Sequence, residues 1–296
     1  MHRHKTDTHQ GMTGNNLKIL SGNDISSVYR ARLKDNVSRY LHDNRAPSLK
    51  IVVIGTDSTS LHYARLTKDA GTEDGFLIDI IHLEETDTEE LIGQISFLND
   101  DNRTDGILIQ QPFPPDIDMD KVLSILEPRK DVDGQTLTNR CRFLAGDPFI
   151  VPAVAKAVLT LLKGYSIEMC GKKAAVIGRS WAVGLPIAIM LIRENATVTI
   201  CHSRSVPLEY FTHDADIIVS CAGVPGLVSK KHVKPGSSVI DAGTTKIDDS
   251  IEGDVDFETT AEIASVSPVK GGVGILSLVY TLENTYELYR KNIHCN

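Results

Sequence analysis

Cysteine is scarce in this chain. There are five, an odd number, scattered and without a C-x-x-C pair: Cys141, Cys170, Cys201, Cys221 and Cys295. That pattern argues against a disulfide framework and against structural zinc, and we expect no metal site. No stretch approaches the roughly eighteen uninterrupted apolar residues of a transmembrane helix. The N-terminus lacks an apolar signal-peptide core, and we therefore expect a cytoplasmic protein with reduced thiols.

Positive charge is also in short supply. The 31 lysines and arginines face 39 aspartates and glutamates, which gives a net charge of −8. Such a surface offers no electrostatic support for nucleic acid or an anionic membrane as the main partner. The chain does contain 41% hydrophobic and 24% charged residues among its 296, which is enough apolar material for a packed core.

Short apolar runs alternate with amphipathic segments along the chain. Runs of Val, Ile and Leu predict strands at 49–54, 77–83, 106–109, 174–177, 197–201, 217–221 and 238–240. Helical spacing predicts helices at 25–41, 60–70, 88–98, 119–126, 153–162, 183–193 and 276–289. Apolar strands separated by helices are typical of parallel sheets covered on both faces. We therefore predict an α/β fold with two α/β domains and a cleft between them, the C-terminal one a Rossmann-like parallel sheet.

These elements fall into two series. We expect residues 16–150 plus 275–296 to form one domain and residues 151–274 to form the other. Residues 1–15 are polar and without period, and they predict a disordered tail. Ligands in open α/β sheets bind beyond the carboxyl ends of the strands, which here points to the cleft.

A glycine-rich turn follows the predicted strand at 174–177. It reads Gly178-Arg179-Ser180-Trp181-Ala182-Val183-Gly184-Leu185-Pro186 and leads into a predicted helix. The first amides of a helix lack internal partners and lie at the positive end of its dipole, which suits a phosphate group. The glycines do not follow the G-x-G-x-x-G pattern, so a purely structural turn is equally compatible with this segment.

The end of the strand at 197–201 bears on the kind of cofactor. NAD-binding units place an acidic residue about 20 positions after the glycine motif, where it binds the ribose hydroxyls. Here the strand is followed by His202-Ser203-Arg204, without a carboxylate. Arg179 and Arg204, with Ser203, could surround a 2′-phosphate, although a solvated basic turn is the plainer alternative. We favour NADP over NAD.

Three further segments accompany the glycine turn and the strand end. They read GTDSTSLHY at 55–63, GILIQQPFP at 106–114, and KDVDG at 130–134 with Asn139. In this order, over roughly residues 16 to 292, the five segments resemble the methylenetetrahydrofolate dehydrogenase/cyclohydrolase family. The resemblance implies a folate cleft between a folate-binding catalytic domain and the dinucleotide-binding domain. It also implies a homodimer formed through the dinucleotide-binding domains.

The resemblance assigns roles to individual residues. Tyr63 would stack on the folate ring system and Asp133 would hydrogen-bond the pterin. Gln110 would line the reaction centre beside Pro112, and Thr67 occupies the remaining catalytic position. The segment that would close the cleft contains Gly271, Gly272 and Gly274. The implied cofactor-binding residues are Gly178, Arg179, Ser180, Val183, Gly184, Pro186, His202, Ser203, Arg204, Cys221, Ala222 and Gly243.

Each of these residues also has a plainer interpretation. Tyr63 could be a half-buried core aromatic and Gln110 a strand-end residue. Asp133 could simply form the turn before Gly134. Asp131 and Asp133 could be taken for a metal pair, but without a further clustered ligand a turn or a pterin contact is favoured.

The chain departs from the family pattern at the catalytic lysine, which the family places four residues after the tyrosine. Thr67 stands there, followed by Lys68. At about 100° per residue, a side chain four positions on lies ~40° from the tyrosine direction, and one five positions on lies ~140° away. Lys68 therefore points to another face, and we interpret the catalytic lysine as absent.

Two ligand segments also differ from the family. Its PCTPxG becomes PAVAKA at 152–157, and its TPVPGGVGPMT becomes SPVKGGVGILS at 267–277. In the second segment Lys270 replaces a proline. It is either a new cation for a ligand carboxylate or a solvated loop lysine.

The family joins two reactions that depend differently on the lysine. Hydride transfer from the one-carbon bridge of methylenetetrahydrofolate requires alignment, whereas hydrolysis of the methenyl product requires water activation and proton movement. Thr67 cannot act as a base near neutral pH. We therefore predict an NADP-dependent dehydrogenase with weak or absent cyclohydrolase. The alternatives are a fully bifunctional enzyme, a catalytically silent dinucleotide-binding paralogue, and the same scaffold acting on another substrate.

Overall fold

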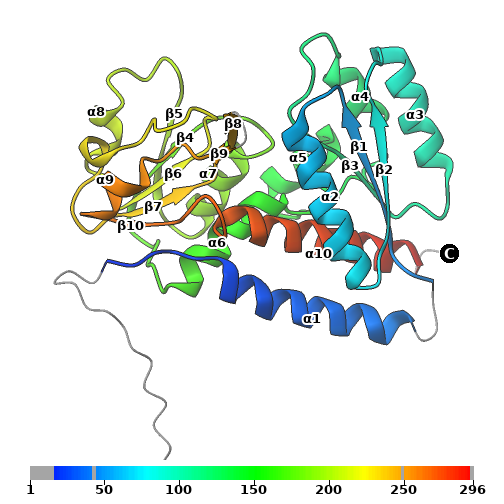
Figure 1. The fold of residues 1–296 in the computed structure, drawn as a ribbon, viewed down its shortest axis with the longest axis horizontal. Helices are drawn as coiled ribbons and strands as arrows, with labels where there is room; N and C mark the ends of the chain where they lie inside the picture. Colours follow the sequence, from blue (N-terminus) through cyan, green and yellow to red (C-terminus); the bar gives the residue numbers. More distant parts are fainter. Residues whose placement is uncertain (1–16, 42–44, 248–249, 294–296) are drawn as a thin grey trace, which may run out of the picture.

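The computed structural model describes residues 17–41, 45–247 and 250–293. The tail predicted for residues 1–15 lies outside these residues. Two α/β lobes stand side by side above two long helices, one near each end of the chain (Figure 1). None of the helices in the described residues is long and apolar enough to span a membrane.

The first lobe contains a three-stranded parallel sheet in the order β2-β1-β3. Its elements are α1 (Asn23–Leu41), β1 (Ser48–Ile54), α2 (Ser58–Glu73), β2 (Leu77–Leu83), α3 (Thr88–Asp100), β3 (Gly106–Ile109), α4 (Met119–Ile125) and α5 (Leu137–Ala145). Alternate residues of β1 enter two different cores. Ile51 and Val53 pack with α1, α2 and the C-terminal helix, whereas Val52 and Ile54 pack with α3 and α4. A strand covered on both faces explains the continuous run of apolar residues from Ile51 to Ile54.

The second lobe contains a five-stranded parallel sheet in the order β10-β7-β6-β4-β5. Its elements are α6 (Ala153–Gly164), β4 (Lys173–Ile177), α7 (Gly184–Arg193), β5 (Thr197–Cys201), α8 (Glu209–Thr212), β6 (Ile217–Ser220), a 3₁₀ turn η1 (Lys230–His232), β7 (Ser238–Asp241), β8 (Thr245–Ile247), β9 (Ser250–Glu252), α9 (Phe257–Ala261) and β10 (Ser265–Val266). Helices cover the two faces of the sheet (Figure 1). The predicted α/β fold with a Rossmann-like C-terminal sheet is confirmed.

The last helix, α10 (Val273–Ile293), belongs to both lobes. Its first half places Leu276 and Tyr280 in the core of the second lobe beside α6. Farther along the helix, Leu282 and Tyr286 lie in the core of the first lobe. Because α10 packs in both cores, the assignment of 275–296 to the first domain stays a prediction.

Candidate active site

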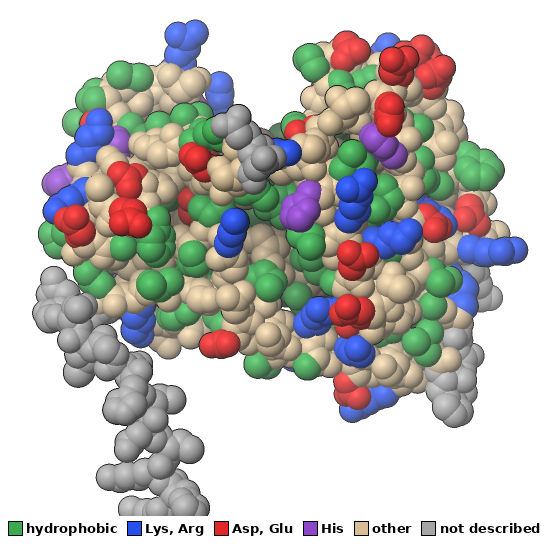
Figure 2. Space-filling model, in the orientation of Figure 1, with side chains coloured by type: hydrophobic (Ala, Val, Ile, Leu, Met, Phe, Trp, Pro, Cys, Tyr) green, Lys and Arg blue, Asp and Glu red, His purple; other side chains and the backbone are tan. Residues whose placement is uncertain are grey.

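The surface of the molecule is hollowed between the two lobes (Figure 2). Helix α2 lines this cleft, and a side-chain cap fixes where the helix begins. The Asp57 carboxylate accepts a hydrogen bond of 2.7 Å from the amide of Ser60. The Ser60 hydroxyl lies 2.8 Å from that carboxylate and 2.8 Å from the carbonyl of Gln111, on the loop after β3. The first turn of α2 is thereby tied to the segment that carries Gln110.

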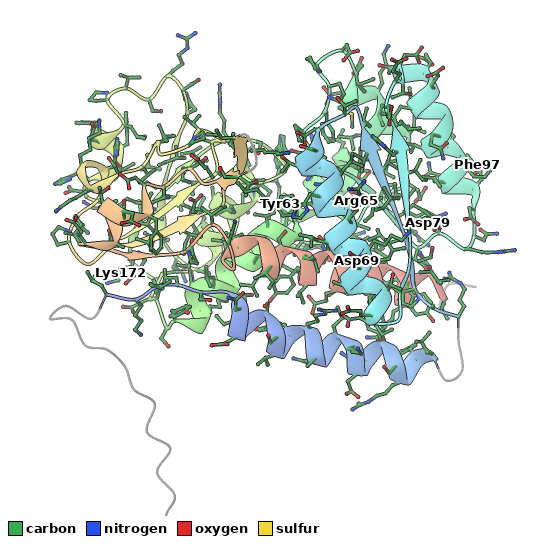
Figure 3. The ribbon with its side chains drawn as sticks, in the orientation of Figure 1. Tyr63, Arg65, Asp69, Asp79, Phe97 and Lys172 are labelled. Carbon is green, nitrogen blue, oxygen red and sulfur yellow. The ribbon has the colours of Figure 1, made fainter. Side chains whose placement is uncertain are left out.

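Tyr63 lies on the side of α2 that faces the second lobe, whereas Arg65 and Asp69 lie on other sides (Figure 3). Burial raises the pKa of Tyr63, and a hydrogen bond with the Thr244 side chain offsets part of that shift. A Cβ atom added to Gly274 would lie 3.8 Å from the Tyr63 hydroxyl. Thr244 lies between β7 and β8 of the second lobe, and Gly274 lies in the first turn of α10, so Tyr63 stands where the lobes meet.

The three predicted residues of the glycine segment have different nearest neighbours, and Gly274 is next to Tyr63. A Cβ atom on Gly271 would lie within 3 Å of the Asn23 side chain, at the start of α1. Gly272 packs against the carbonyl of Pro268. The predicted closing role is therefore spatially compatible with Gly274, while Gly271 and Gly272 attach the segment to its neighbours.

One turn after Tyr63, Thr67 is buried with 7% of its surface exposed. Lys68, for which the helical spacing predicts another face of α2 than that of Tyr63, is exposed. Another amine does cross the cleft: Nζ of Lys246 on β8 donates to Oγ of Ser58 at 2.7 Å. Ser58 precedes Thr67 by nine residues, or about 13 Å along the helix. Lys246 therefore contacts the start of α2 and does not occupy the position of Thr67.

Gln110 and Pro112 follow β3 at its carboxyl end. The amide of Gln110 donates to the carbonyl of Val52 at 2.8 Å, which continues the sheet by one residue. The peptide bond between Gln111 and Pro112 is cis. Gln110 is half-buried and Pro112 is exposed, so both remain accessible near the first turn of α2.

The structure separates the two aspartates of the KDVDG segment. Asp131 is buried, and its carboxylate accepts hydrogen bonds from the amides of Gln135 and Thr136 and from Nδ2 of Asn139, all at 2.8–2.9 Å. Asp133 is half-buried, and no hydrogen bond or ion pair joins its carboxyl group to another described residue. Burial, with the charge of Asp131, raises the pKa of Asp133 to about 7. Asp131 therefore holds the turn, whereas the carboxyl group of Asp133 has no partner among the described residues.

The glycine turn lies at the carboxyl end of β4 and requires both its glycines. Gly178 has φ +132°, and a Cβ atom there would lie 2.6 Å from Sγ of Cys221. A Cβ atom on Gly184 would lie 2.5 Å from the carbonyl carbon of Gly178. Helix α7 begins at Gly184 without a side-chain cap and without an acidic residue in its first turn. Its N-terminus is therefore suited to a phosphate group.

Strand pairing brings the two basic segments together. Ile177 pairs with Cys201, and the amide of Gly178 donates to the carbonyl of Cys201 at 2.9 Å. Arg179 and Arg204 therefore follow neighbouring strands at the same edge of the sheet. The described residues Arg179, Ser180, Ser203 and Arg204 are all exposed, and no ion pair joins either arginine to another described residue.

The other predicted cofactor residues lie along the same edge. Pro186 is in the first turn of α7, His202 follows β5, Cys221 and Ala222 follow β6, and Gly243 follows β7. The sequence did not reveal Asp254, which is fully buried and organises the loop after β6. Its carboxylate accepts hydrogen bonds from the amides of Ala222 and Val224, at 2.6 and 2.9 Å. Burial and Asp254 raise the pKa of Cys221 to about 12, so its thiol stays protonated.

A contact between the lobes reaches the glycine turn itself. The guanidinium carbon of Arg140, on α5, lies 5.5 Å from the centroid of the Trp181 ring. Nη2 of the same arginine donates to Oε1 of Gln135 at 3.4 Å. A cation over an indole face is attractive. Arg140 therefore links the turn that follows Asp133 to the turn expected to bind the cofactor.

No described group of three or more His, Cys, Asp or Glu residues is arranged to hold a metal ion.

Two family models together match most of the chain. The catalytic domain of tetrahydrofolate dehydrogenase/cyclohydrolase matches residues 20–133, and the NAD(P)-binding domain of the same enzyme matches residues 152–293. The chain belongs to this family. The match confirms the expected folate-enzyme family and the expected nicotinamide dinucleotide cofactor.

Individual relatives of the family are similar over nearly their whole length. The bifunctional protein FolD of Staphylococcus carnosus is 40% identical over 271 residues, covering 90% of this chain and 95% of that protein. The solved 5,10-methylenetetrahydrofolate dehydrogenase of the silkworm Bombyx mori is 36% identical, with a TM-score of 0.87 over 94% of this chain and 99% of that one. The dehydrogenase-cyclohydrolase of Trypanosoma brucei, solved with NADP and an inhibitor, is 33% identical, with a TM-score of 0.89 over 94% and 98%. Because two of these names describe bifunctional enzymes, the comparisons lend no support to the expected loss of cyclohydrolase.

Proposed function

We propose that this chain is an NADP-dependent dehydrogenase that oxidises 5,10-methylenetetrahydrofolate to methenyltetrahydrofolate, with weak or absent cyclohydrolase activity. One observation carries the proposal. On the face of α2 where Tyr63 reaches the second lobe, the next turn offers the hydroxyl of Thr67 and no ammonium group. That arrangement retains the parts that align two ligands and lacks the part that moves a proton.

Two binding regions flank Tyr63. On the first lobe, Asp133 presents a carboxyl group that has no described partner, and Gln110 lies on the neighbouring loop. A carboxyl group can pair with the amino and ring nitrogens of a pterin, and Tyr63 offers its ring for stacking. We therefore infer that the folate lies on the first lobe with its one-carbon bridge directed toward the second lobe.

The glycine turn fits a pyrophosphate. Gly178 and Gly184 leave room for backbone approach, and α7 begins without a competing cap. Arg179, Ser203 and Arg204 supply two charges and a hydroxyl at the sheet edge, where a carboxylate would repel a 2′-phosphate. The bound nicotinamide supplies the hydride acceptor. The protein's part in hydride transfer is alignment, which can provide about 7–11 kcal/mol of a barrier in favourable systems.

Hydrolysis of the methenyl product makes a different demand. A group that activates water or moves its proton contributes about 10²–10⁴-fold. Thr67 can donate and accept hydrogen bonds, but it carries no charge and is not basic near pH 7. The expected result is a product that leaves the enzyme largely unhydrolysed.

The second candidate is a fully bifunctional enzyme. It is favoured by the 40% identity to a relative named bifunctional and by Lys246, an amine that reaches α2 from the other lobe. In this case Lys246, or Asp133 with its raised pKa, would take over the proton transfer. The two candidates differ only in the fate of the methenyl product.

We further propose a homodimer formed through the second lobe, and a folate-binding domain made of residues 16–150 and 275–296. The support for the dimer is β5, an edge strand that pairs with β4 on one side. Thr197, Thr199 and Ile200 of β5 are exposed, as is Ile192 on the adjacent α7. An exposed edge strand with apolar side chains is suited to pairing with another chain.

The test supplies 5,10-methylenetetrahydrofolate with NADP or NAD and records reduced cofactor and methenyltetrahydrofolate separately. We expect NADPH to form in step with the methenyl species, and much more slowly with NAD. No reduction of either cofactor, with NADP binding intact, would overturn the dehydrogenase and favour a silent paralogue or another substrate.

A further inference from the structure

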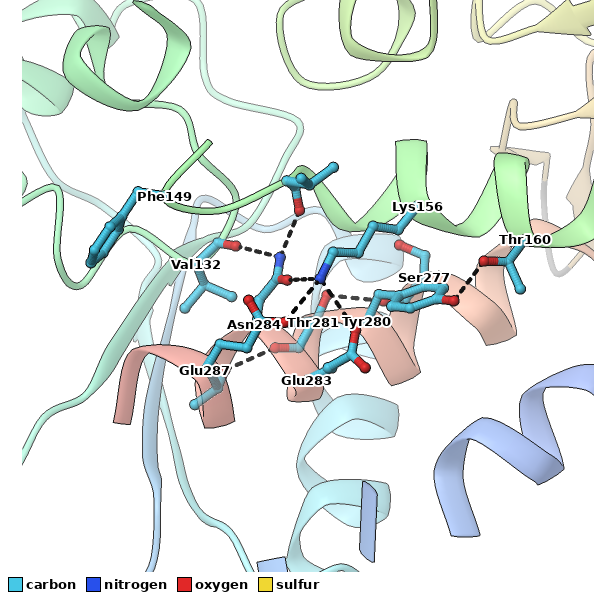
Figure 4. A network of polar contacts seen from close by, with 12 residues as sticks. Val132, Phe149, Lys156, Thr160, Ser277, Tyr280, Thr281, Glu283, Asn284 and Glu287 are labelled. Carbon is cyan, nitrogen blue, oxygen red and sulfur yellow. Dashed lines mark hydrogen bonds and ion pairs between the residues drawn. The ribbon is translucent and has the colours of Figure 1, made fainter. Parts of the chain in front are cut away.

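A buried amide joins the two lobes behind the cleft. Asn284 lies in the middle of α10 with no exposed surface. Its Nδ2 atom donates two hydrogen bonds of 2.9 Å, one to the carbonyl of Val132 and one to the carbonyl of Val151 (Figure 4). The two carbonyls lie nineteen residues apart in sequence, on the two segments that lead into the cleft and into the second lobe.

Lys156 fixes the orientation of that amide. Nζ of Lys156, on α6, donates to Oδ1 of Asn284 at 2.9 Å. It also lies 3.2 Å from the carboxylate of Glu283 and 3.5 Å from that of Glu287. A flipped amide would set its NH₂ group against the ammonium and its oxygen against two carbonyls. The cation therefore holds both amide hydrogens on the main chain.

The two main-chain partners define what the amide controls. Val132 immediately precedes Asp133, and its own amide is held by the carbonyl of Ile107 on β3 at 3.3 Å. Val151 immediately precedes Pro152, where the chain enters α6 and the second lobe. The same helix α10 starts next to Gly274, which faces Tyr63. Asn284 thus fixes the relative positions of three parts of the molecule. These are the turn that contains Asp133, the segment at Val151 that leads into the second lobe, and the start of α10 next to Tyr63.

The Asp133 carboxyl group depends on this main-chain attachment because no described side chain holds it. Its neighbour Asp131 is fastened by three hydrogen bonds, so the turn itself is stable. A buried carbonyl that loses its donor costs about 1–3 kcal/mol. Relaxation of the Val132 carbonyl toward another donor would move the adjacent Asp133.

We propose that Asn284, oriented by Lys156, is a positioning residue for Asp133 and so sets folate binding in the dehydrogenase reaction. This inference rests on the proposed function, in which Asp133 contacts the pterin. No hydrogen bond or ion pair joins either of these described residues to the glycine turn at β4, and we expect NADP binding to depend on other residues. The signature is therefore a change in the folate KM without a change in the NADP KM.

The first variant is Asn284→Asp, which keeps size and the acceptor for Lys156 but removes both amide hydrogens. We expect the folate KM to rise about 10- to 100-fold, the cost of an unsatisfied buried carbonyl and a displaced contact, with the NADP KM within about 2-fold. Asn284→Asp with a lowered unfolding temperature and both KM values unchanged would reduce the residue to a structural role and overturn the proposal.

A second pair of variants carries the test if Asn284→Asp does not fold. Lys156→Met removes the cation and keeps most of the stem, and should raise the folate KM about 3- to 10-fold because the amide is free to flip. Lys156→Arg should restore the wild-type value. The matched control is Glu287→Gln, which removes one partly exposed ion pair of Lys156 and should leave both KM values unchanged.

The wild-type enzyme separates this proposal from the proposed function. Failure of the wild type to oxidise methylenetetrahydrofolate would overturn the function and the positioning role that depends on it. An active wild type, with the same folate KM in Lys156→Met and Lys156→Arg, would overturn the positioning role alone.

Discussion

Helices α2 and α7 both begin at the cleft, but their first turns are built differently. The Asp57 carboxylate caps α2 and satisfies the amide of Ser60, whereas α7 starts at Gly184 with no side-chain cap. A carboxylate at a helix start occupies the amides and repels anions. Helix α7 is therefore open to a phosphate, whereas we expect α2 to contribute to binding through the side chains along its face.

The two helices also differ in how closely they follow the family resemblance. The turn before α7 retains both glycines, and the structure requires each of them for backbone approach. Helix α2 retains Tyr63 but has Thr67 in the lysine position. Cofactor binding should therefore be robust, and any loss of chemistry should be confined to the step that uses α2.

The largest effect is expected from closing the α7 turn with Gly184→Ala. The new Cβ atom would lie 2.5 Å from the carbonyl carbon of Gly178 and 2.9 Å from the amide nitrogen of Arg179, and neither backbone atom can move freely. We expect the Kd for NADP to rise by about 100-fold or more, because the turn must open and its amides diverge. Calorimetric titration with NADP measures it.

The matched control is Gly93→Ala on α3, where nothing lies within 4 Å of the new Cβ atom. This variant should bind NADP normally, because the new Cβ atom meets nothing. Its unfolding temperature should rise slightly, because alanine is the better helix former by about 1 kcal/mol. Normal NADP affinity in Gly184→Ala would contradict the proposed difference between α7 and α2, because it would mean that the phosphate does not bind at the start of α7.

The next largest effect is expected on α2, where Thr67→Lys should add an activity instead of removing one. An ammonium one turn after Tyr63 should raise the rate of methenyltetrahydrofolate hydrolysis about 10²-fold, with the dehydrogenase rate retained. Thr67→Met, of similar length and without charge, controls for the change in volume at this buried position. Equal rates of methenyltetrahydrofolate hydrolysis in Thr67→Lys and Thr67→Met would show that an ammonium group at position 67 is not sufficient for this reaction.

A smaller effect is expected at the edge of the sheet beside α7. Arg204→Ala should raise the NADP KM about 10- to 100-fold, the loss of one charge-assisted contact, and leave the NAD KM nearly unchanged. The control is Arg39→Ala, which removes an exposed arginine of α1 in the first lobe. An equal rise in the KM values for NADP and NAD would mean that Arg204 contacts the pyrophosphate that both cofactors share, and would remove the argument for NADP.

The smallest effect is a change in the pH dependence of stability. The pKa of Asp133 is raised to about 7 when folded, so between about pH 4 and pH 7 the folded state retains a proton that the unfolded chain releases. Its contribution to stability is therefore present at low pH and lost as the pH rises through 7. We therefore expect the free energy of unfolding, measured in urea, to fall less between pH 5 and pH 8 in Asp133→Asn than in the wild type.

Asp241, whose pKa burial raises to about 6, adds to the same trend in both proteins and cancels in their difference. A difference between wild type and Asp133→Asn that does not vary with pH would contradict the raised pKa of Asp133.

The sequence predicts the sheets well because their strands are buried on both faces. The runs at β1 and β4 consist of Val, Ile, Leu and Ala, apart from Ser48 and Lys50 in β1 and Lys173 at the start of β4, and alternate apolar residues enter opposite cores. Helix α5 is not among the predicted helices because it is only nine residues long and its apolar residues include Leu137 and Leu144, which are exposed. Its ends carried the available signal: Thr136 caps the start, and Gly146 ends it at φ +88°.

The site was predictable to the extent that its residues lie close together in sequence. The spacing of Tyr63 and Lys68 predicts different faces of α2 for the two side chains, and Lys68 is exposed whereas Tyr63 is half-buried. The different roles of Asp131, which is hydrogen-bonded within the turn, and Asp133, whose carboxyl group has no described partner, depend on hydrogen bonds that composition does not reveal. The pairing of Lys156 with Asn284 joins residues 128 positions apart, and only the packing of α6 on α10 brings them together.

The most direct measurement follows both products of one wild-type reaction, starting from 5,10-methylenetetrahydrofolate and NADP. A helix that aligns ligands without an ammonium group predicts that methenyltetrahydrofolate accumulates with NADPH and then decays at its spontaneous rate. Decay that accelerates in proportion to enzyme concentration would contradict this account and establish a cyclohydrolase that does not need a lysine at position 67.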